Sequence, residues 1–85
     1  MKLPVIVRER LDLESGGEPR FGMWIVDWLD RYWADLDQPE LLTNTIAFAF
    51  DRPRGMVRIE DDIAMFDSYE VPFDELREYL LARYP

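Results

Sequence analysis

The sequence predicts an α+β fold, in which an antiparallel sheet of about four strands carries two packed helices in the order β-α-β-β-β-α. Two observations favour this class. Apolar residues recur at helical spacing over residues 21–36 and again over 73–84. Residues 45–50 alternate large and small side chains and are followed by turn residues, which is typical of antiparallel strands. The length of 85 residues suits one compact unit, so we expect a single domain over residues 1–85.

The N-terminal segment, residues 3–13, is predicted to form the first strand. Val5 and Val7 begin a loose alternation of apolar and polar positions. Pro4 favours an edge position or the first residue of that strand. A glycine-containing loop is expected at residues 15–19.

Residues 21–36 hold all three tryptophans and are predicted to form the first helix. The apolar arc of this helix spans about 200°, whereas a surface helix usually buries about 100° or slightly more. The additional aromatic surface is either extra core or part of a docking surface. Trp28 is expected to be deeply buried, and Asp27 and Arg31 are expected to form a surface ion pair.

The start of this helix has an alternative. Gly22 and the β-branched pair Ile25-Val26 are poor helix formers. Residues 20–26 could instead pair with the N-terminal segment as a strand, with Asp27 capping a shorter helix. We favour the long helix.

The middle of the chain is predicted to form a meander of three short antiparallel strands. The first is residues 45–50, and a turn at 51–55 leads into the second at 56–60. Two acids then reverse the chain into a third strand at 63–66. Residues 41–42, in the preceding connection, are expected to cap the core.

The last helix is predicted to begin at Pro72 or Phe73. Acids in its first turn and Arg83 in its last turn suit the helix dipole. We expect its apolar stripe to be buried, and this stripe comprises Phe73, Leu76, Leu80 and Tyr84.

The composition argues against catalysis. The chain contains no histidine and no cysteine, so the usual proton shuttle and thiolate ligands are missing. No glycine loop suited to phosphate is present. We therefore expect no enzyme activity, no cofactor and no metal.

The charge and hydropathy pattern constrain the partner. No apolar run is long enough for a bilayer span or a signal peptide, so we expect a cytoplasmic protein that does not bind membranes. The net charge of −8 opposes direct nucleic-acid binding and favours encounter with a basic protein. The alternative is that the charge serves only solubility.

A segment rich in acids and tyrosines is the strongest candidate for a binding surface. Eight acids lie within residues 60–78 against one arginine, and acids guide encounter while aromatic rings supply buried area. Some of these acids are equally explained by a turn or by the helix dipole. The basic turn Arg52-Pro53-Arg54 could bind an acidic group of a partner or balance neighbouring acids, and we favour balance. The predicted partner-binding residues are Glu60, Asp61, Asp62, Asp67, Tyr69, Glu70, Glu78 and Trp33.

Residues 55–80, GMVRIEDDIAMFDSYEVPFDELREYL, resemble the strand, tight turn, strand and VPFDEL helix that end small bacterial toxin-immunity proteins. The resemblance covers about a third of the chain and transfers no binding residue. It implies a stoichiometric protein inhibitor, an antitoxin that covers the active site of a basic toxin or nuclease. Phage anti-defence inhibitors, including anti-CRISPR proteins, share this size and acidity. A third hypothesis is a small structural or assembly subunit whose tryptophans mediate oligomerisation, and homodimer formation stays open.

Overall fold

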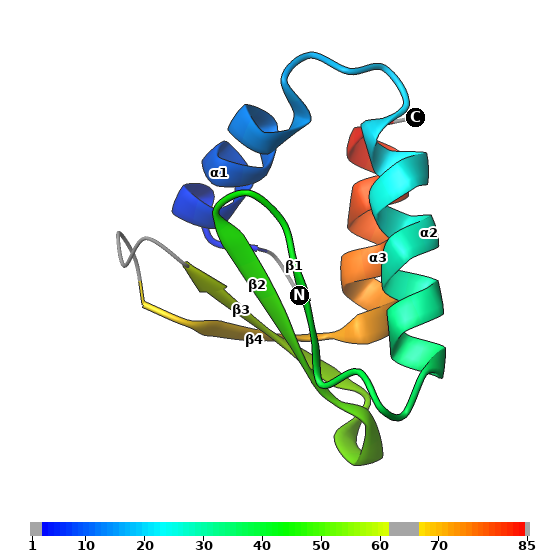
Figure 1. Cartoon of the computed structure of the whole chain (residues 1–85). Helices are drawn as coiled ribbons and strands as arrows, with labels where there is room; N and C mark the ends of the chain where they lie inside the picture. Colours follow the sequence, from blue (N-terminus) through cyan, green and yellow to red (C-terminus); the bar gives the residue numbers. More distant parts are fainter. Residues whose placement is uncertain (1–2, 62–66, 85) are drawn as a thin grey trace.

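The computed structural model describes residues 3–61 and 67–84. Three helices and four strands share one core (Figure 1). The strands pair antiparallel in the order β1-β2-β3-β4, so the α+β class and the antiparallel four-stranded sheet are confirmed. The elements are α1 (Val5–Ser15), α2 (Phe21–Ala34), β1 (Glu40–Leu42), β2 (Ile46–Asp51), the short 3-10 helix η1 (Arg52–Arg54), β3 (Met56–Asp61), β4 (Tyr69–Pro72) and α3 (Phe73–Arg83).

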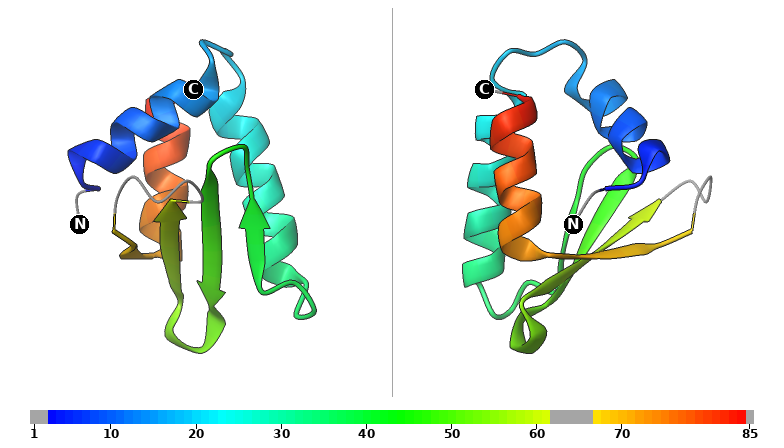
Figure 2. Two further views of the ribbon diagram at one scale, coloured as in Figure 1. Left: turned by 60° about the vertical axis from the view of Figure 1, so that its left-hand side comes forward. Right: turned by 180° about the vertical axis from the view of Figure 1, so that it is seen from behind.

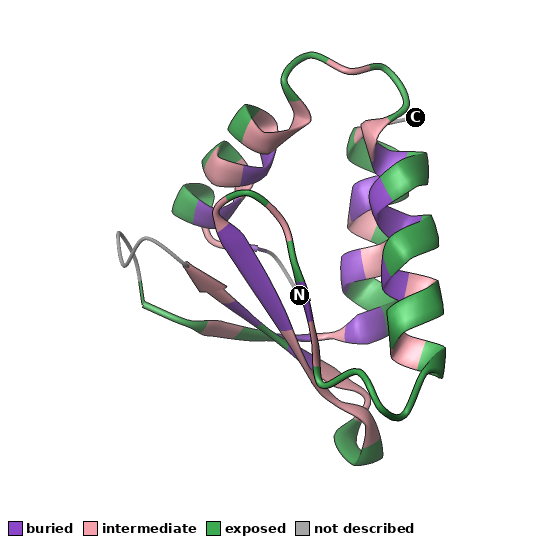
Figure 3. Ribbon diagram, viewed as in Figure 1, coloured by how far each residue is buried: buried purple, intermediate pink, exposed green. Residues whose placement is uncertain are grey.

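The helices cover one face of the sheet. α2 and α3 run antiparallel beside each other, and α1 lies apart from them beyond the loop that arches over the top of Figure 1 (Figures 1 and 2). Buried residues lie on the sides of these elements that face one another (Figure 3). The register places one row of side chains across the covered face of all four strands, namely Leu41, Phe48, Ile59 and Tyr69.

The prediction of an N-terminal strand is wrong, because Val5–Ser15 form helix α1. The segment satisfies two periods at once, since its valines alternate but its core residues also recur every four positions. Gly16 ends the helix in the left-handed conformation, with φ of 57°. The buried residues at this spacing are Leu3, Val7 and Leu11.

The meander is confirmed in part. β2 and β3 match the predicted strands at 45–50 and 56–60, and the large side chains of β2 face the core. The predicted strand at 63–66 lies outside the described residues. The structure adds β4, directly before α3, and β1, in which Leu41 caps the core as expected but Leu42 is exposed because successive residues of a strand face opposite sides.

The long aromatic helix is confirmed as α2, which ends at Ala34. The prediction that Trp28 is deeply buried is wrong, since its side chain is 46% exposed. α2 instead buries the neighbouring side, because Gly22 lets the helix approach the backbone of α3 at Leu80 closely. The buried stripe of α3 is confirmed, with Tyr84 partly buried beside it. No helix within residues 3–61 and 67–84 is both long and apolar enough to cross a bilayer.

Arg52 closes the C-terminal end of α2. Its Nε donates to the main-chain carbonyl of Trp33 at 2.8 Å, and the two N–H groups of Nη2 are shared among the carbonyls of Tyr32 at 2.8 Å, Asp35 at 2.6 Å and Gln38. Tyr32 and Trp33 lie in the last turn of α2, where a helix cannot pair its own carbonyls in the regular way, and Asp35 and Gln38 lie in the connection that follows it. This half of the basic turn therefore stabilises a helix end rather than balancing acids.

The other half of the basic turn does balance acids, as expected. Arg54 pairs with Glu70 at 2.6 Å and with Asp51 at 3.0 Å. The side chains of Arg54 and Glu70 are 57% and 38% exposed, so the pair contributes little to stability.

A second cluster joins α1 to the end of α3. Asp12 accepts hydrogen bonds from the Tyr84 hydroxyl at 2.5 Å and from Arg83 at 3.1 Å. The Tyr84 hydroxyl holds the pKa of Asp12 below its usual value. Burial, together with Asp12, raises the pKa of Tyr84.

Candidate functional site

One edge of α2 exposes three aromatic side chains. Trp24, Trp28 and Tyr32 recur every four residues and are 48%, 46% and 37% exposed. Each ring of this kind removes about 150–250 Å² from water when it becomes buried. A contiguous exposed apolar patch on a small protein marks an interaction site more often than a scattered one does.

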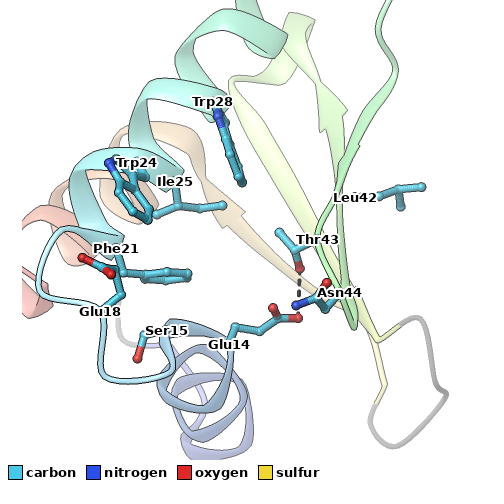
Figure 4. Close-up of a pocket in the computed structure, with 10 residues that line it drawn as sticks. All are labelled: Glu14, Ser15, Glu18, Phe21, Trp24, Ile25, Trp28, Leu42, Thr43 and Asn44. Carbon is cyan, nitrogen blue, oxygen red and sulfur yellow. Dashed lines mark hydrogen bonds between the residues drawn. The ribbon is translucent and has the colours of Figure 1, made fainter.

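A groove runs between this aromatic edge and β1. Its upper part is a pocket of about 450 Å³, enclosed by the end of α1, the first half of α2 and the turn after β1 (Figure 4). Two further pockets, of about 340 and 310 Å³, continue along β1. Neighbouring pockets share Trp28, Tyr32 and Leu42, so together they form the α2–β1 groove.

Glu14 fixes the upper wall of the α2–β1 groove. Its Oε1 accepts hydrogen bonds from the Thr45 amide at 2.6 Å, the Thr45 hydroxyl at 2.7 Å and the Thr43 hydroxyl at 3.0 Å. Figure 4 shows this carboxylate opposite Trp28, on the far side of the pocket. The contacts tie the last turn of α1 to the turn between β1 and β2, so this end of the groove is held by contacts within the protein.

The lining of the α2–β1 groove is acidic. Glu14 and Glu18 line its upper pocket, Arg31 contributes a guanidinium, and Glu40 borders its lower part from the open face of the sheet. Arg31 pairs with Asp27 at 2.6 Å, which confirms the predicted surface pair and neutralises the cation. The groove therefore combines aromatic surface with negative charge.

The acids predicted from the sequence do not lie on one free surface. Asp61 faces the covered side of the sheet, opposite Ile46, and its side chain is 0% exposed. Arg10 of α1 reaches it at 2.7 Å. Glu60, on the open face of the sheet, pairs with Arg58 at 2.5 Å. These two acids make contacts within the molecule, and Glu70 does so as well through Arg54.

The remaining predicted site residues are divided between core and surface. Tyr69 and Trp33 are partly buried, and the Trp33 ring stacks on Phe73 with centroids 4.2 Å apart. Asp67 and Glu78 are exposed, and Asp62 lies outside the described residues. Partner binding by this set stays a prediction. Among its described acids, only Asp67 and Glu78 form no ion pair within the part of the chain that the structure describes.

Sequence reasoning missed the groove residues Trp24, Trp28, Tyr32 and Leu42. The signal was the width of the apolar arc of α2, which exceeded what one core could cover. The arc could not show which edge faces outward. That choice depends on the packing of α2 against α3 at Gly22, which joins residues far apart in the sequence.

Metal binding and nucleophilic catalysis each need a particular arrangement of side chains. In the part of the chain that the structure describes, no group of three or more acidic, histidine or cysteine side chains is arranged to hold a metal ion. The groove offers a serine and a threonine, Ser15 and Thr43, but Ser15 donates its hydroxyl to the carbonyl of Asp12 at 2.6 Å. Comparison with protein-family models gave no match, and searches of curated proteins and of solved structures gave none either.

Proposed function

We propose that this protein is a stoichiometric protein inhibitor, of the immunity-protein kind, that binds a basic partner protein through the α2–β1 groove. The carrying observation is that Trp24, Trp28 and Tyr32 are exposed together along one acidic groove. The resemblance of residues 55–80 to toxin-immunity proteins supports the same class of function.

The groove provides the two elements of a tight protein interface. Exposed tryptophan and tyrosine rings are the side chains that most often dominate binding energy when a partner buries them. The net charge of −8 accelerates encounter with a basic partner and disfavours acidic ones. An inhibitor needs only such a surface and a rigid support, which the four-stranded sheet and its helices supply.

The test uses candidate partners encoded beside this protein. Any basic neighbour with toxic or enzymatic activity is mixed with the purified protein, and binding is measured by calorimetry alongside activity. We expect binding at one-to-one stoichiometry and loss of activity at equal concentrations. A complex that forms without inhibition would contradict an inhibitory role.

Matched variants locate the surface. Trp24→Ala and Trp28→Ala should each weaken binding by about 2 kcal/mol, chiefly through a faster off-rate. Met23→Ala is the control, because Met23 is 54% exposed on α2 but does not line the groove. If both tryptophan variants bind as tightly as the Met23 variant, the groove is not the interface.

The acidic segment predicted from the sequence is tested separately. Asp67→Asn with Glu78→Gln removes two exposed charges without disturbing an ion pair in the described part of the chain. If these acids steer the partner, the on-rate falls and depends less on ionic strength, while the off-rate is unchanged. An unchanged on-rate would mean that this segment is only a solvated surface.

A small assembly subunit is the second candidate, because the same exposed tryptophans suit self-association. The charge of −8 on each copy opposes it. Sedimentation at rising concentration and at high salt decides between them, since an inhibitor stays monomeric and an assembly subunit forms oligomers.

A further inference from the structure

We infer that the α2–β1 groove takes an extended segment of the partner as an added strand on β1, with apolar and basic side chains alternating along that segment. This inference rests on the proposed function and specifies the binding mode. Addition of a strand to an exposed sheet edge is one of the recurring ways in which proteins bind peptides.

The hydrogen-bond pattern leaves one side of β1 open. Leu41 pairs with Phe48 at the centre of β1. On one side of this pair, the amide of Thr43 donates to the carbonyl of Ile46 at 2.9 Å. On the other side, the amide of Phe50 donates to the carbonyl of Pro39, also at 2.9 Å. In an antiparallel pair such bonded positions alternate with positions that point away.

The outward positions of β1 are therefore Glu40 and Leu42. Within residues 3–61 and 67–84, neither residue has a hydrogen bond on that outer side. Two N–H groups and two carbonyls are thus available along the groove. An exposed strand edge of this kind can pair with another chain.

An added strand would meet different surroundings on its two faces. Side chains directed toward the helices would contact Tyr32, which lines both lower pockets with β1, and Trp28, which lines one of them. Side chains directed to the open face would lie beside Glu40 and Leu42, which are on that face with Ala49 and Ala47. Apolar residues suit the first set of positions, and a lysine or arginine suits the position beside Glu40.

Charge favours a partner segment over a second copy of this chain. Two glutamates line the groove, a third borders it on the open face of the sheet, and the one guanidinium is already paired, so a basic segment is complementary to it. Two copies joined at β1 would instead bring two such acidic grooves together, each on a chain of net charge −8.

The first experiment uses a short synthetic peptide in which lysine alternates with isoleucine. Amide hydrogen exchange is followed by nuclear magnetic resonance. We expect saturating peptide to slow exchange at the outward amides of Glu40 and Leu42 by about tenfold or more and to shift the Trp28 indole signal. A peptide with glutamate in place of lysine is the charge control and should not bind.

Two N-methylated peptides then test pairing itself. One carries the methyl groups on the isoleucine amides, and the other carries them on the lysine amides. An added strand bonds through only one of its edges, so one peptide should bind like the parent and the other should lose about tenfold or more in affinity. Equal affinity of the two methylated peptides would overturn strand addition. If the indole signal of Trp28 still shifted in that case, the groove would remain supported as the interface. No binding of any peptide would overturn the inference, while the proposed function is judged on the whole partner.

A protein variant gives an independent measurement. Leu42→Pro removes an N–H that points away from β2, and proline is accepted at such edge positions. Leu42→Ala is the matched control, because it shortens the same side chain and keeps the N–H. We expect the proline variant to bind the peptide about tenfold more weakly than the alanine variant, and equal binding would overturn the inference. If the proline variant does not fold, the methylated peptides decide alone.

Discussion

Gly22 lies in α2 at a position where helix propensity and packing predict opposite effects of a substitution by alanine on stability. By propensity alone, Gly22→Ala should stabilise the protein by about 1 kcal/mol, since glycine is a poor residue inside a helix. The structure places α3 against this glycine. A Cβ added at Gly22 would lie 2.5 Å from the carbonyl oxygen of Leu80, 2.8 Å from the Cβ of Tyr84 and closer still to the Tyr84 carbonyl oxygen.

The expected cost follows from which atoms are in the way. Carbon and oxygen atoms in contact normally lie about 3.3–3.6 Å apart, so the ends of α2 and α3 must separate by about 1 Å. The Leu80 carbonyl oxygen belongs to the main chain of α3 and cannot rotate aside as a side chain would, and Tyr84 directly follows that helix. Overpacking of this kind costs about 3 kcal/mol, which leaves a net loss of about 2 kcal/mol after the gain in helix propensity.

Urea unfolding followed by circular dichroism measures the effect, together with thermal unfolding. We expect Gly22→Ala to lower the melting temperature by about 8–16 °C. Met23→Ala is the control at the next residue, which is 54% exposed, and its free energy of unfolding should change by less than about 0.5 kcal/mol. If Gly22→Ala is as stable as the parent protein or more so, the close approach of α2 and α3 is refuted.

Three further predictions concern the core, a helix end and pH. Leu80 is 0% exposed, so Leu80→Ala should lower the free energy of unfolding by about 2–5 kcal/mol, and a loss below about 1 kcal/mol would contradict its place in the core. Arg52→Lys keeps the charge but cannot reproduce the forked donation to four carbonyls, so urea unfolding should show a loss of about 1–2 kcal/mol, and no loss would contradict the cap. The pKa of Tyr84 is raised in the folded protein, so its contribution to stability is present below pH 10.0 and is lost as pH rises toward the folded pKa. The pKa of Asp12 is lowered, so its contribution is present above pH 3.8 and is lost as pH falls through the folded pKa. Tyr84→Phe should reduce the loss in the free energy of unfolding at alkaline pH, and Asp12→Asn should reduce the loss at acid pH. Unchanged pH profiles of the free energy of unfolding would contradict these assignments.

The elements that could be predicted from the sequence are those with a strong local period. α2, α3, β2 and β3 are long enough for side-chain spacing to define them. β1 has three residues and β4 has four, the last of them proline, so neither is long enough to display a period. Residues 3–13 satisfy both periods, and only tertiary packing selects the helix.

The candidate site depended still more on tertiary structure. The sequence showed an excess of aromatic surface on one helix, but the contact of Gly22 with α3 decides that Trp28 faces outward. Likewise, an acid beside a predicted turn suggests an exposed group. The register of β3 nevertheless turns Asp61 to the covered face, where Arg10 neutralises it.

The cluster of Asp12, Arg83 and Tyr84 has a consequence for how the protein is made. A ribosome synthesises α1 early, but the groups that hold Asp12 are added only at residues 83 and 84. The hairpin of β2 and β3 can close as soon as its own residues have emerged, because its contacts are local. α1 can already contact the β1–β2 turn through Glu14 and β3 through Arg10 before α3 has been made, so completion of α3 adds the contacts of Asp12 to a helix that other elements already hold.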